Sequence, residues 1–98
     1  MDVVVRNQII VALMQALLGA ISPNFRAVLI DFSQGIDVKF FLAQHLIDDA
    51  DEIDDVITEF DSLMMGVKAL PIKYCIAVGE GRIDFSGDNV IPIYIGRE

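Results

Sequence analysis

The sequence predicts a single α+β domain, residues 1–98, with a four- to five-stranded, mostly antiparallel sheet and two α-helices packed on it. Three observations predict this class. Two segments show apolar residues at helical spacing, several short runs alternate as strands do, and no linker or low-complexity tract divides the chain. With 54% apolar residues, the chain can form a core without disulfides or a structural metal. We therefore expect one domain.

The first helix is predicted from the apolar segment that precedes Ser22-Pro23-Asn24. Proline disfavours helix in the residue before it and lacks a backbone donor, so the helix should stop there. The segment contains Gln15 and is too short for a membrane span of ~20 residues. Its lead-in, with Arg6 alone, is a poor secretion signal. The predicted buried stripe of a heavily buried helix is Ile10, Met14, Leu17 and Ile21, widened by Ile9, Leu13 and Leu18, with Gln8, Ala12, Gln15 and Gly19 opposite.

A β-hairpin is the strongest local prediction. The runs 26–32 and 36–42 are rich in strand-forming residues, and Ser33-Gln34-Gly35 between them supplies the glycine that a hairpin turn requires. In the second run, Ile36, Val38, Phe40 and Leu42 alternate with more polar residues. These four side chains should enter the core.

The second helix should begin near Asp48 or Asp49, whose carboxylates can cap free amides, and end near Met65, before Gly66. Its predicted buried stripe is Ile53, Val56, Ile57, Phe60 and Met64, and its predicted outward residues are Asp51, Asp54, Asp55, Thr58 and Asp61. The remaining predicted strands are 72–78, 82–85 and 90–95, and Pro92 makes the last an edge strand or forces a bulge in it.

Composition restricts the compartment and the partner. Cys75 is the only cysteine, so no internal disulfide can form; it lies in an alternating apolar run, which predicts a buried, inert thiol in a reducing compartment, the cytoplasm. The formal net charge of −8 repels a phosphate backbone. We therefore expect no direct contact with nucleic acid. An acidic chain permits a cationic protein partner, although acidity for solubility alone explains the same composition.

No catalytic, cofactor or metal motif is found. His45 is the only histidine, and neither it nor Cys75 has the neighbouring groups that a nucleophile and base require. The acidic run from Asp48 to Asp55 lacks the register of a calcium loop, because a loop counted from Asp49 would place Ile53 at a ligand position. Gly79-Glu80-Gly81 lacks the third glycine of a dinucleotide fingerprint. We predict no cofactor and no enzyme.

Surfaces for protein recognition remain. The acidic face of the second helix is predicted to bind a partner through Asp51, Asp54, Asp55 and Asp61, although a solvated face explains the same pattern. Phe41 is the predicted aromatic anchor. Alternation places it on the second face of the sheet, together with Phe25, Leu29, Asp31, Asp37 and Lys39. The alternative is that the first helix simply covers this face.

The segment from Leu17 to Val28, LLGAISPNFRAV, followed by a short hairpin and an acidic helix, resembles small bacterial immunity proteins of contact-dependent growth inhibition and related polymorphic toxin systems. The likeness covers residues 8–65. Ala20 departs from the pattern, which has an acidic residue in this turn. The resemblance implies a cytoplasmic antitoxin that binds the C-terminal toxin domain of its cognate inhibitor, frequently a nuclease, and catalyses no reaction itself.

Two other functions remain open on the residues alone. One is a structural or regulatory subunit that forms a homodimer through an edge strand. The other is a small enzyme that uses His45 and nearby carboxylates. A toxin gene immediately upstream would favour the immunity protein, a concentration-dependent dimer without another partner would favour the structural subunit, and turnover abolished by a change of His45 would favour the enzyme.

Overall fold

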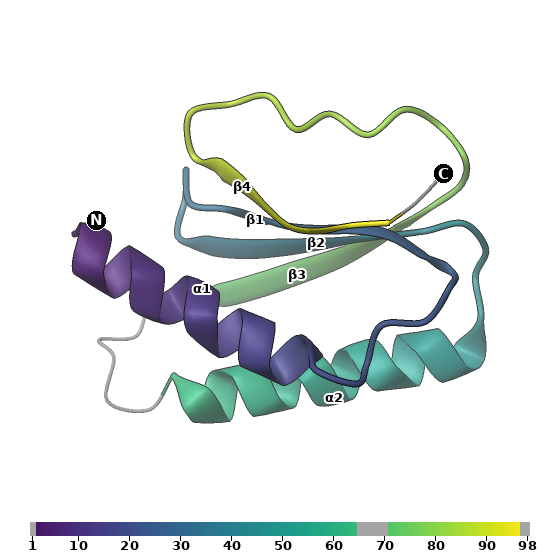
Figure 1. The fold of residues 1–98 in the computed structure, drawn as a ribbon, viewed down its shortest axis with the longest axis horizontal. Coiled ribbons are helices and arrows are strands. Elements are labelled where there is room, and N and C mark those ends of the chain that lie inside the picture. The colour runs from purple at the N-terminus through teal and green to yellow at the C-terminus, as the bar shows by residue number, and fades with distance from the viewer. Residues whose placement is uncertain (1, 65–70, 97–98) are drawn as a thin grey trace. The chain divides into compact units, whose positions relative to one another are not determined.

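The computed structural model describes residues 2–64 and 71–96 and contains two helices and one four-stranded sheet (Figure 1). The order along the chain is α1 (Val3–Leu17), β1 (Phe25–Asp31), β2 (Ile36–Leu42), α2 (Ile47–Leu63), β3 (Ile72–Val78) and β4 (Val90–Ile95). This confirms the predicted α+β class. Contacts group the chain into a helical unit, residues 1–21 and 47–69, and a sheet unit, residues 22–46 and 70–98.

The helical unit consists of α1 and α2, which pack against each other. Asp2 precedes α1 and accepts a hydrogen bond from the backbone N–H of Val4 at 3.0 Å, as an N-cap residue does. Neither helix is long and apolar enough to cross a membrane, within the residues described. In α2, Ile53, Val56 and Phe60 are buried, as is Met64 just beyond it, which confirms four of the five predicted positions. Ile57 is half-buried.

The predicted buried stripe of α1 was rotated around the helix axis relative to the side that is buried. Ile9, Leu13 and Leu17 are buried, but so are Ala12 and Ala16, whereas Met14 and Leu18 are 51% and 80% exposed. The helix is apolar almost all round, so the spacing of its large residues does not identify the buried side. Small alanines allow close approach of a neighbouring segment, and here they lie on the buried side. The helix is therefore only partly buried.

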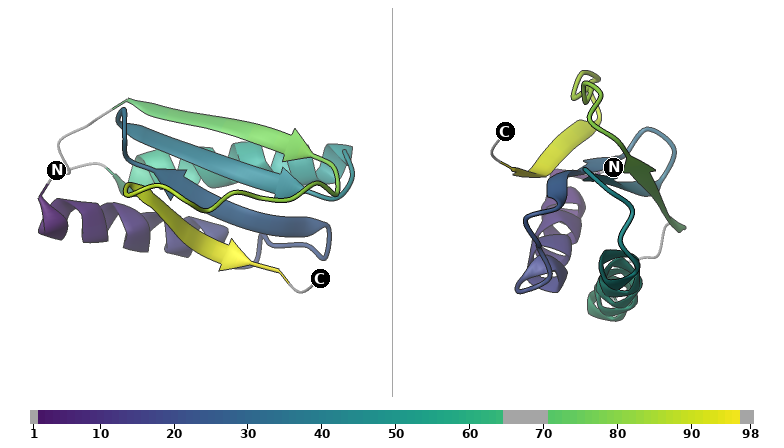
Figure 2. Two further views of the ribbon diagram at one scale, coloured as in Figure 1. Left: turned by 90° about the horizontal axis from the view of Figure 1, so that it is seen from above. Right: turned by 90° about the vertical axis from the view of Figure 1, so that its right-hand side faces the viewer.

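The sheet unit has the strand order β3-β2-β1-β4, which Figure 2 shows from above. β1 pairs antiparallel with β2 and with β4, whereas β2 and β3 are parallel. The predicted hairpin is confirmed, and Gly35 in its turn has a φ of +107°, a conformation that favours glycine. The sheet is therefore mixed, with two of its three pairings antiparallel.

The alternation predicted for β2 is confirmed, since Ile36, Val38, Phe40 and Leu42 are all buried. Their face of the sheet, here called the inner face, also contains Tyr74, whose ring meets that of Phe40 edge-on at 6.4 Å. The opposite face, which contains Lys39 and Phe41, is called the outer face. The strand register assigns the side chain of each remaining sheet residue to one of these two faces.

Two irregularities change the register of β1. Phe25 pairs with Leu42 but Ala27 pairs with Phe41, so Arg26 is an extra residue, a β-bulge. A bulge reverses the alternation. Phe25 therefore lies on the inner face, where its ring meets Phe40 edge-on at 6.5 Å, and its predicted place on the outer face was wrong.

β4 confirms both consequences expected of Pro92. The strand lies at an edge of the sheet, and its pairing with β1 shifts where Val28 faces Tyr94 and Leu29 faces Pro92. Ile93 is therefore the extra residue. The strand predicted at 82–85 does not exist. These residues belong to an extended connection between β3 and β4 that has no strand partner among the described residues.

Candidate partner-binding surfaces

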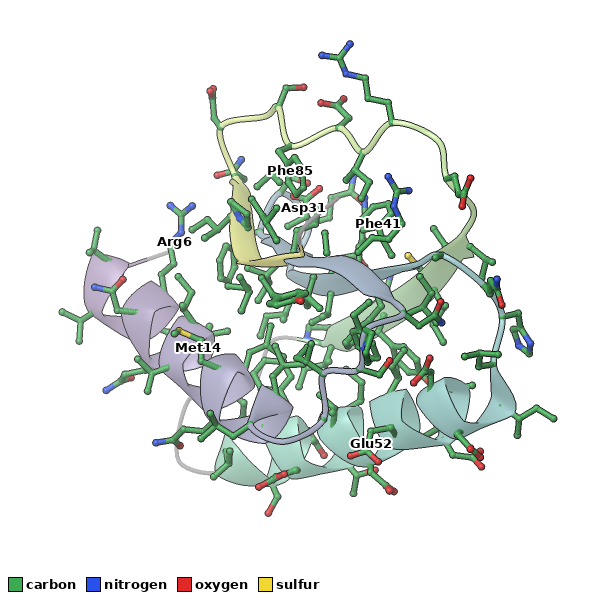
Figure 3. The ribbon with its side chains drawn as sticks, turned by 45° about the vertical axis from the view of Figure 1, so that its right-hand side comes forward. Arg6, Met14, Asp31, Phe41, Glu52 and Phe85 are labelled. Carbon is green, nitrogen blue, oxygen red and sulfur yellow. The ribbon has the colours of Figure 1, made fainter. Side chains whose placement is uncertain are left out.

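The outward face of α2 is acidic. Between Asp48 and Asp61 the helix has eight acidic residues and no basic one; seven of the eight are exposed, and Asp49 is buried. Burial of Ile53, Val56 and Phe60 fixes the orientation of the helix, and the spacing then leaves the four predicted contact residues outside. Asp51, Asp54, Asp55 and Asp61 are all exposed. Figure 3 shows Glu52 on the same helix.

This acidic surface is unfavourable for the helix that bears it. Asp48 and Asp49 in the first turn interact well with the positive end of the helix dipole. Asp61 lies in the last turn, where the dipole repels a carboxylate and where no basic residue is present. Acid pairs four residues apart, such as Asp51 with Asp55 and Asp55 with Glu59, repel one another by about 0.2–0.5 kcal/mol each. Helix stability therefore does not explain these residues.

The outer face of the sheet is the second candidate surface. The β3–β4 connection, residues 79–89, lies over this face, as Figures 1 and 2 show. Figure 3 shows Asp31, Phe41 and Phe85 on this side of the sheet. Phe41 is half-buried and lines two hollows, of ≈ 160 and ≈ 390 Å³. The second also contains Leu29, Asp31 and Lys39, and the register pairs Asp37 with Asp31, so the predicted grouping is confirmed for every residue except Phe25.

Arg26 links the β3–β4 connection to the sheet through hydrogen bonds. Its Nη1 donates hydrogen bonds to the carbonyl oxygens of Gly79, at 2.9 Å, and Gly81, at 2.8 Å. The bulge that makes Arg26 an extra residue places its side chain beside the connection rather than in the alternation of β1. Arg26 and Arg82 line a third hollow of ≈ 310 Å³ with Phe85 and Ile95. Sequence reasoning missed this role, because Arg26 was assigned to a regular strand.

Charges on the outer face are locally satisfied. Asp31 accepts hydrogen bonds from the backbone N–H of Ser33 at 2.9 Å and from its Oγ at 2.7 Å, and Lys39 Nζ lies 4.0 Å from Asp31 Oδ2. The bonds from Ser33 lower the pKa of Asp31 below its ordinary value. Bonds from Ser86 similarly lower the pKa of Asp84. These carboxylates therefore stay ionised, and none has the raised pKa of a general acid.

The two residues considered for catalysis lie on different segments of the sheet unit. His45 is exposed in the connection between β2 and α2. Cys75 is exposed on the outer face of β3, and its predicted burial was wrong, because β3 is an edge strand rather than a central one. Partial desolvation, and then the charge of Asp37, raise the pKa of its thiol and disfavour the thiolate. Among residues 2–64 and 71–96, no group of three or more possible ligands could hold a metal ion.

A further apolar surface was missed by the sequence prediction. Val4, Val11, Met14 and Leu18 of α1 and the turn after it are between 51% and 80% exposed. Their spacing of seven, three and four residues places them along one side of the helix. The prediction assigned Met14 and Leu18 to the core. Only their phase relative to the alanines, which becomes clear in the folded chain, distinguishes the two sides.

The fold and these surfaces define a small α+β protein with an acidic helix face and a sheet over one face of which the β3–β4 connection lies. Residues 6–80 match the model of the MafI2 immunity protein family, and the chain belongs to this family. The comparison with curated proteins found no match. The matched segment runs from α1 to just beyond β3, so β4 lies outside it.

Family membership gives the general role. MafI2 proteins are immunity proteins of polymorphic toxin systems, so the general role of the chain is that of an inhibitor that neutralises a cognate toxin. The resemblance read from residues 8–65 is thereby confirmed at the level of a bacterial immunity protein.

Proposed function

We propose that the chain neutralises a cationic toxin domain, a nuclease, by binding it through the acidic face of α2, chiefly Asp51, Asp54, Asp55 and Asp61. The observation that supports this is the charge of the helix: eight acidic residues, no basic one, and an outward face that destabilises the helix itself. A nuclease domain must attract phosphate, so its surface is basic. The chain captures the toxin in the cytoplasm, and a contact-dependent growth inhibition system delivers the toxin to the cell.

The carboxylates act mainly on the rate of association. Exposed ion pairs are worth only ~0–1 kcal/mol each, so four of them do not give tight binding. Complementary charge instead steers the encounter and fixes the orientation of the partner. Tight binding requires a desolvated centre as well, and Phe41 is the proposed aromatic contact in the sheet unit. Its half-buried ring, beside the hollows of the outer face, supports this role.

The test is a charge reversal with a matched control. Asp54→Lys with Asp55→Lys should slow association with the toxin domain encoded beside this gene and reduce its salt dependence. Glu80→Lys with Asp88→Lys changes the net charge equally in the exposed β3–β4 connection. Stopped-flow association rates at two ionic strengths compare the two variants. If both double variants slow association alike, net charge alone steers the toxin. If neither variant slows association, the acidic face of α2 is only a solvated surface and does not contact the toxin.

The contribution of Phe41 is measured separately. Phe41→Ala should increase the dissociation rate while leaving the association rate nearly unchanged, because truncating a buried anchor acts mainly on dissociation. Circular dichroism of Phe41→Ala is the control for general disturbance of the sheet. An unchanged dissociation rate in Phe41→Ala would place the toxin contact elsewhere. The alternative function, a structural or regulatory subunit, would show no binding to the toxin at all.

A further inference from the structure

The two edges of the sheet are built differently. At one edge, β4 has Pro92 and an extra residue, Ile93, two features that prevent another strand from pairing there. At the other edge, β3 runs for seven residues without proline and pairs with β2 without a register shift. Lys73 is its only charged residue. Among the described residues, no strand pairs with the far side of β3.

Hydrogen bonds at both ends of β3 show which of its backbone groups face outward. Pro71 O accepts from Ile36 N at 3.3 Å, and Gly79 N donates to Leu42 O at 3.0 Å. Both odd-numbered residues therefore point their backbone groups at β2. Since successive residues of a strand alternate, and the register is unbroken, the N–H and C=O groups of Ile72, Ile76 and Val78 point away from β2.

We propose that two copies of this chain dimerise by antiparallel pairing of their β3 strands, with the two-fold axis at Cys75. This register opposes Ile72 to Val78, so outward-facing residues meet outward-facing residues and can exchange both backbone bonds. It pairs all seven residues of the strand, and a shift in either direction leaves some of them unpaired. The dimer is isologous and joins the two sheets into one.

The side chains of β3 suit this register. On the inner face, each copy places Val78, which is 48% exposed, opposite Ile72 and sets Tyr74 against Ile76, an aromatic and β-branched pair. On the outer face, Lys73 meets Ala77 rather than another lysine, and Cys75 meets Cys75. No like charges are opposed. The exposed apolar side chains of this edge therefore find apolar partners.

The side chains of β3 favour a second copy at this edge. Each lysine here has an acidic neighbour within its own copy, since Lys73 pairs with Asp37 of β2 and Lys39 lies 4.0 Å from Asp31. The proposed register also keeps Lys73 of one copy away from Lys73 of the other. The dimer does not depend on the proposed toxin contact, and it is measured without toxin.

Cross-linking tests the register directly. Cys75 opposes its copy at a position without hydrogen bonds, where Cα atoms approach to ~4.5 Å, a separation that a disulfide can span. Treatment of the whole protein with diamide, which takes up the electrons and protons of the two thiols, should yield a covalent dimer. The control, Cys75→Ser with Ala77→Cys, places the two thiols ~13 Å apart, a four-residue offset, and should cross-link poorly. Equal cross-linking of both would indicate random collision and overturn the register.

A matched pair of charge variants tests the dimer in solution. Cys75→Glu opposes two carboxylates and should weaken dimerisation about fivefold, while Lys39 beside it helps to maintain the fold. Ala77→Glu places the same charge opposite Lys73 of the other copy and should preserve or strengthen the dimer. Sedimentation equilibrium over a concentration series gives the dissociation constants, and circular dichroism checks folding. A wild-type protein that stays monomeric at all concentrations, or equal effects of the two variants, overturns the proposal.

Discussion

Replacing Asp61 with lysine should make the isolated protein more stable, although Asp61 is one of the carboxylates proposed to hold the toxin. Asp61 is exposed and lies in the last turn of α2, which ends at Leu63. The carbonyl end of a helix has a partial negative charge, so it repels a carboxylate and attracts an ammonium group. The substitution exchanges one interaction for the other.

The magnitude follows from these two interactions. Removing the repulsion and gaining the attraction are worth about 0.3–1 kcal/mol each at low ionic strength. The higher helix propensity of lysine adds about 0.3 kcal/mol. Asp61→Lys should therefore raise the free energy of unfolding by about 1 kcal/mol in low salt. The gain should shrink in high salt, because exposed charges are screened.

Urea unfolding followed by circular dichroism, at low and high ionic strength, measures this gain. Asp48→Lys is the control, since Asp48 is also exposed but lies in the first turn, where a carboxylate is favourable. It should give no gain. Equal stabilisation by both reversals would show that net charge rather than the helix dipole is responsible, and a destabilised Asp61→Lys would refute the reasoning.

Three further outcomes are expected. Phe60→Ala removes a fully buried ring and should lower the free energy of unfolding by about 3–5 kcal/mol in denaturant melting, and a loss below ~1 kcal/mol would contradict its place in the core. His45→Ala and Cys75→Ser should protect cells from the toxin as well as wild type, because neither residue has catalytic partners, and a folded variant that binds toxin but fails to protect would reverse this view. Asp31 has a lowered folded-state pKa, so its stabilising contribution is complete above its ordinary pKa of 3.8 and is lost as the pH falls through the lowered value. Ser33→Ala removes one hydrogen bond to Asp31 and should reduce the contribution of Asp31 to the free energy of unfolding, measured in acid titrations. An unchanged dependence of stability on pH in the acidic range would show that this bond does not matter.

The parts of the fold that were predicted correctly are those whose pattern is local. The hairpin, the bounds 72–78 and 90–95, and the buried side of α2 follow from alternation, helical spacing and turn residues. The parts that were not predicted depend on distant contacts. The bulge at Arg26 is visible only in the pairing of β1 with β2, and it alone moved Phe25 to the other face. The segment 82–85 alternates like a strand but finds no strand to pair with.

The candidate binding surfaces likewise contain features that the local sequence pattern predicts and features that depend on distant contacts. The exposure of Asp51, Asp54, Asp55 and Asp61 follows from helical spacing once Ile53, Val56 and Phe60 are buried. The hollows beside Phe41 could not be predicted, because residues of the β3–β4 connection form one wall of them. Cys75 shows the same limit: its run reads as a buried strand, but only the strand order reveals that β3 is an edge.

The strand order also determines when the protein can be finished during synthesis. The two central strands, β1 and β2, form a hairpin within the first 42 residues, a local and rapid event. Both flanking strands are encoded later, and β4, which pairs with β1, ends at Ile95. The hairpin therefore leaves the ribosome with both of its edges unpaired, and the free edge of β1 stays unpaired until β4 has also been synthesised. An antitoxin built in this order cannot complete its sheet before its fourth strand has emerged.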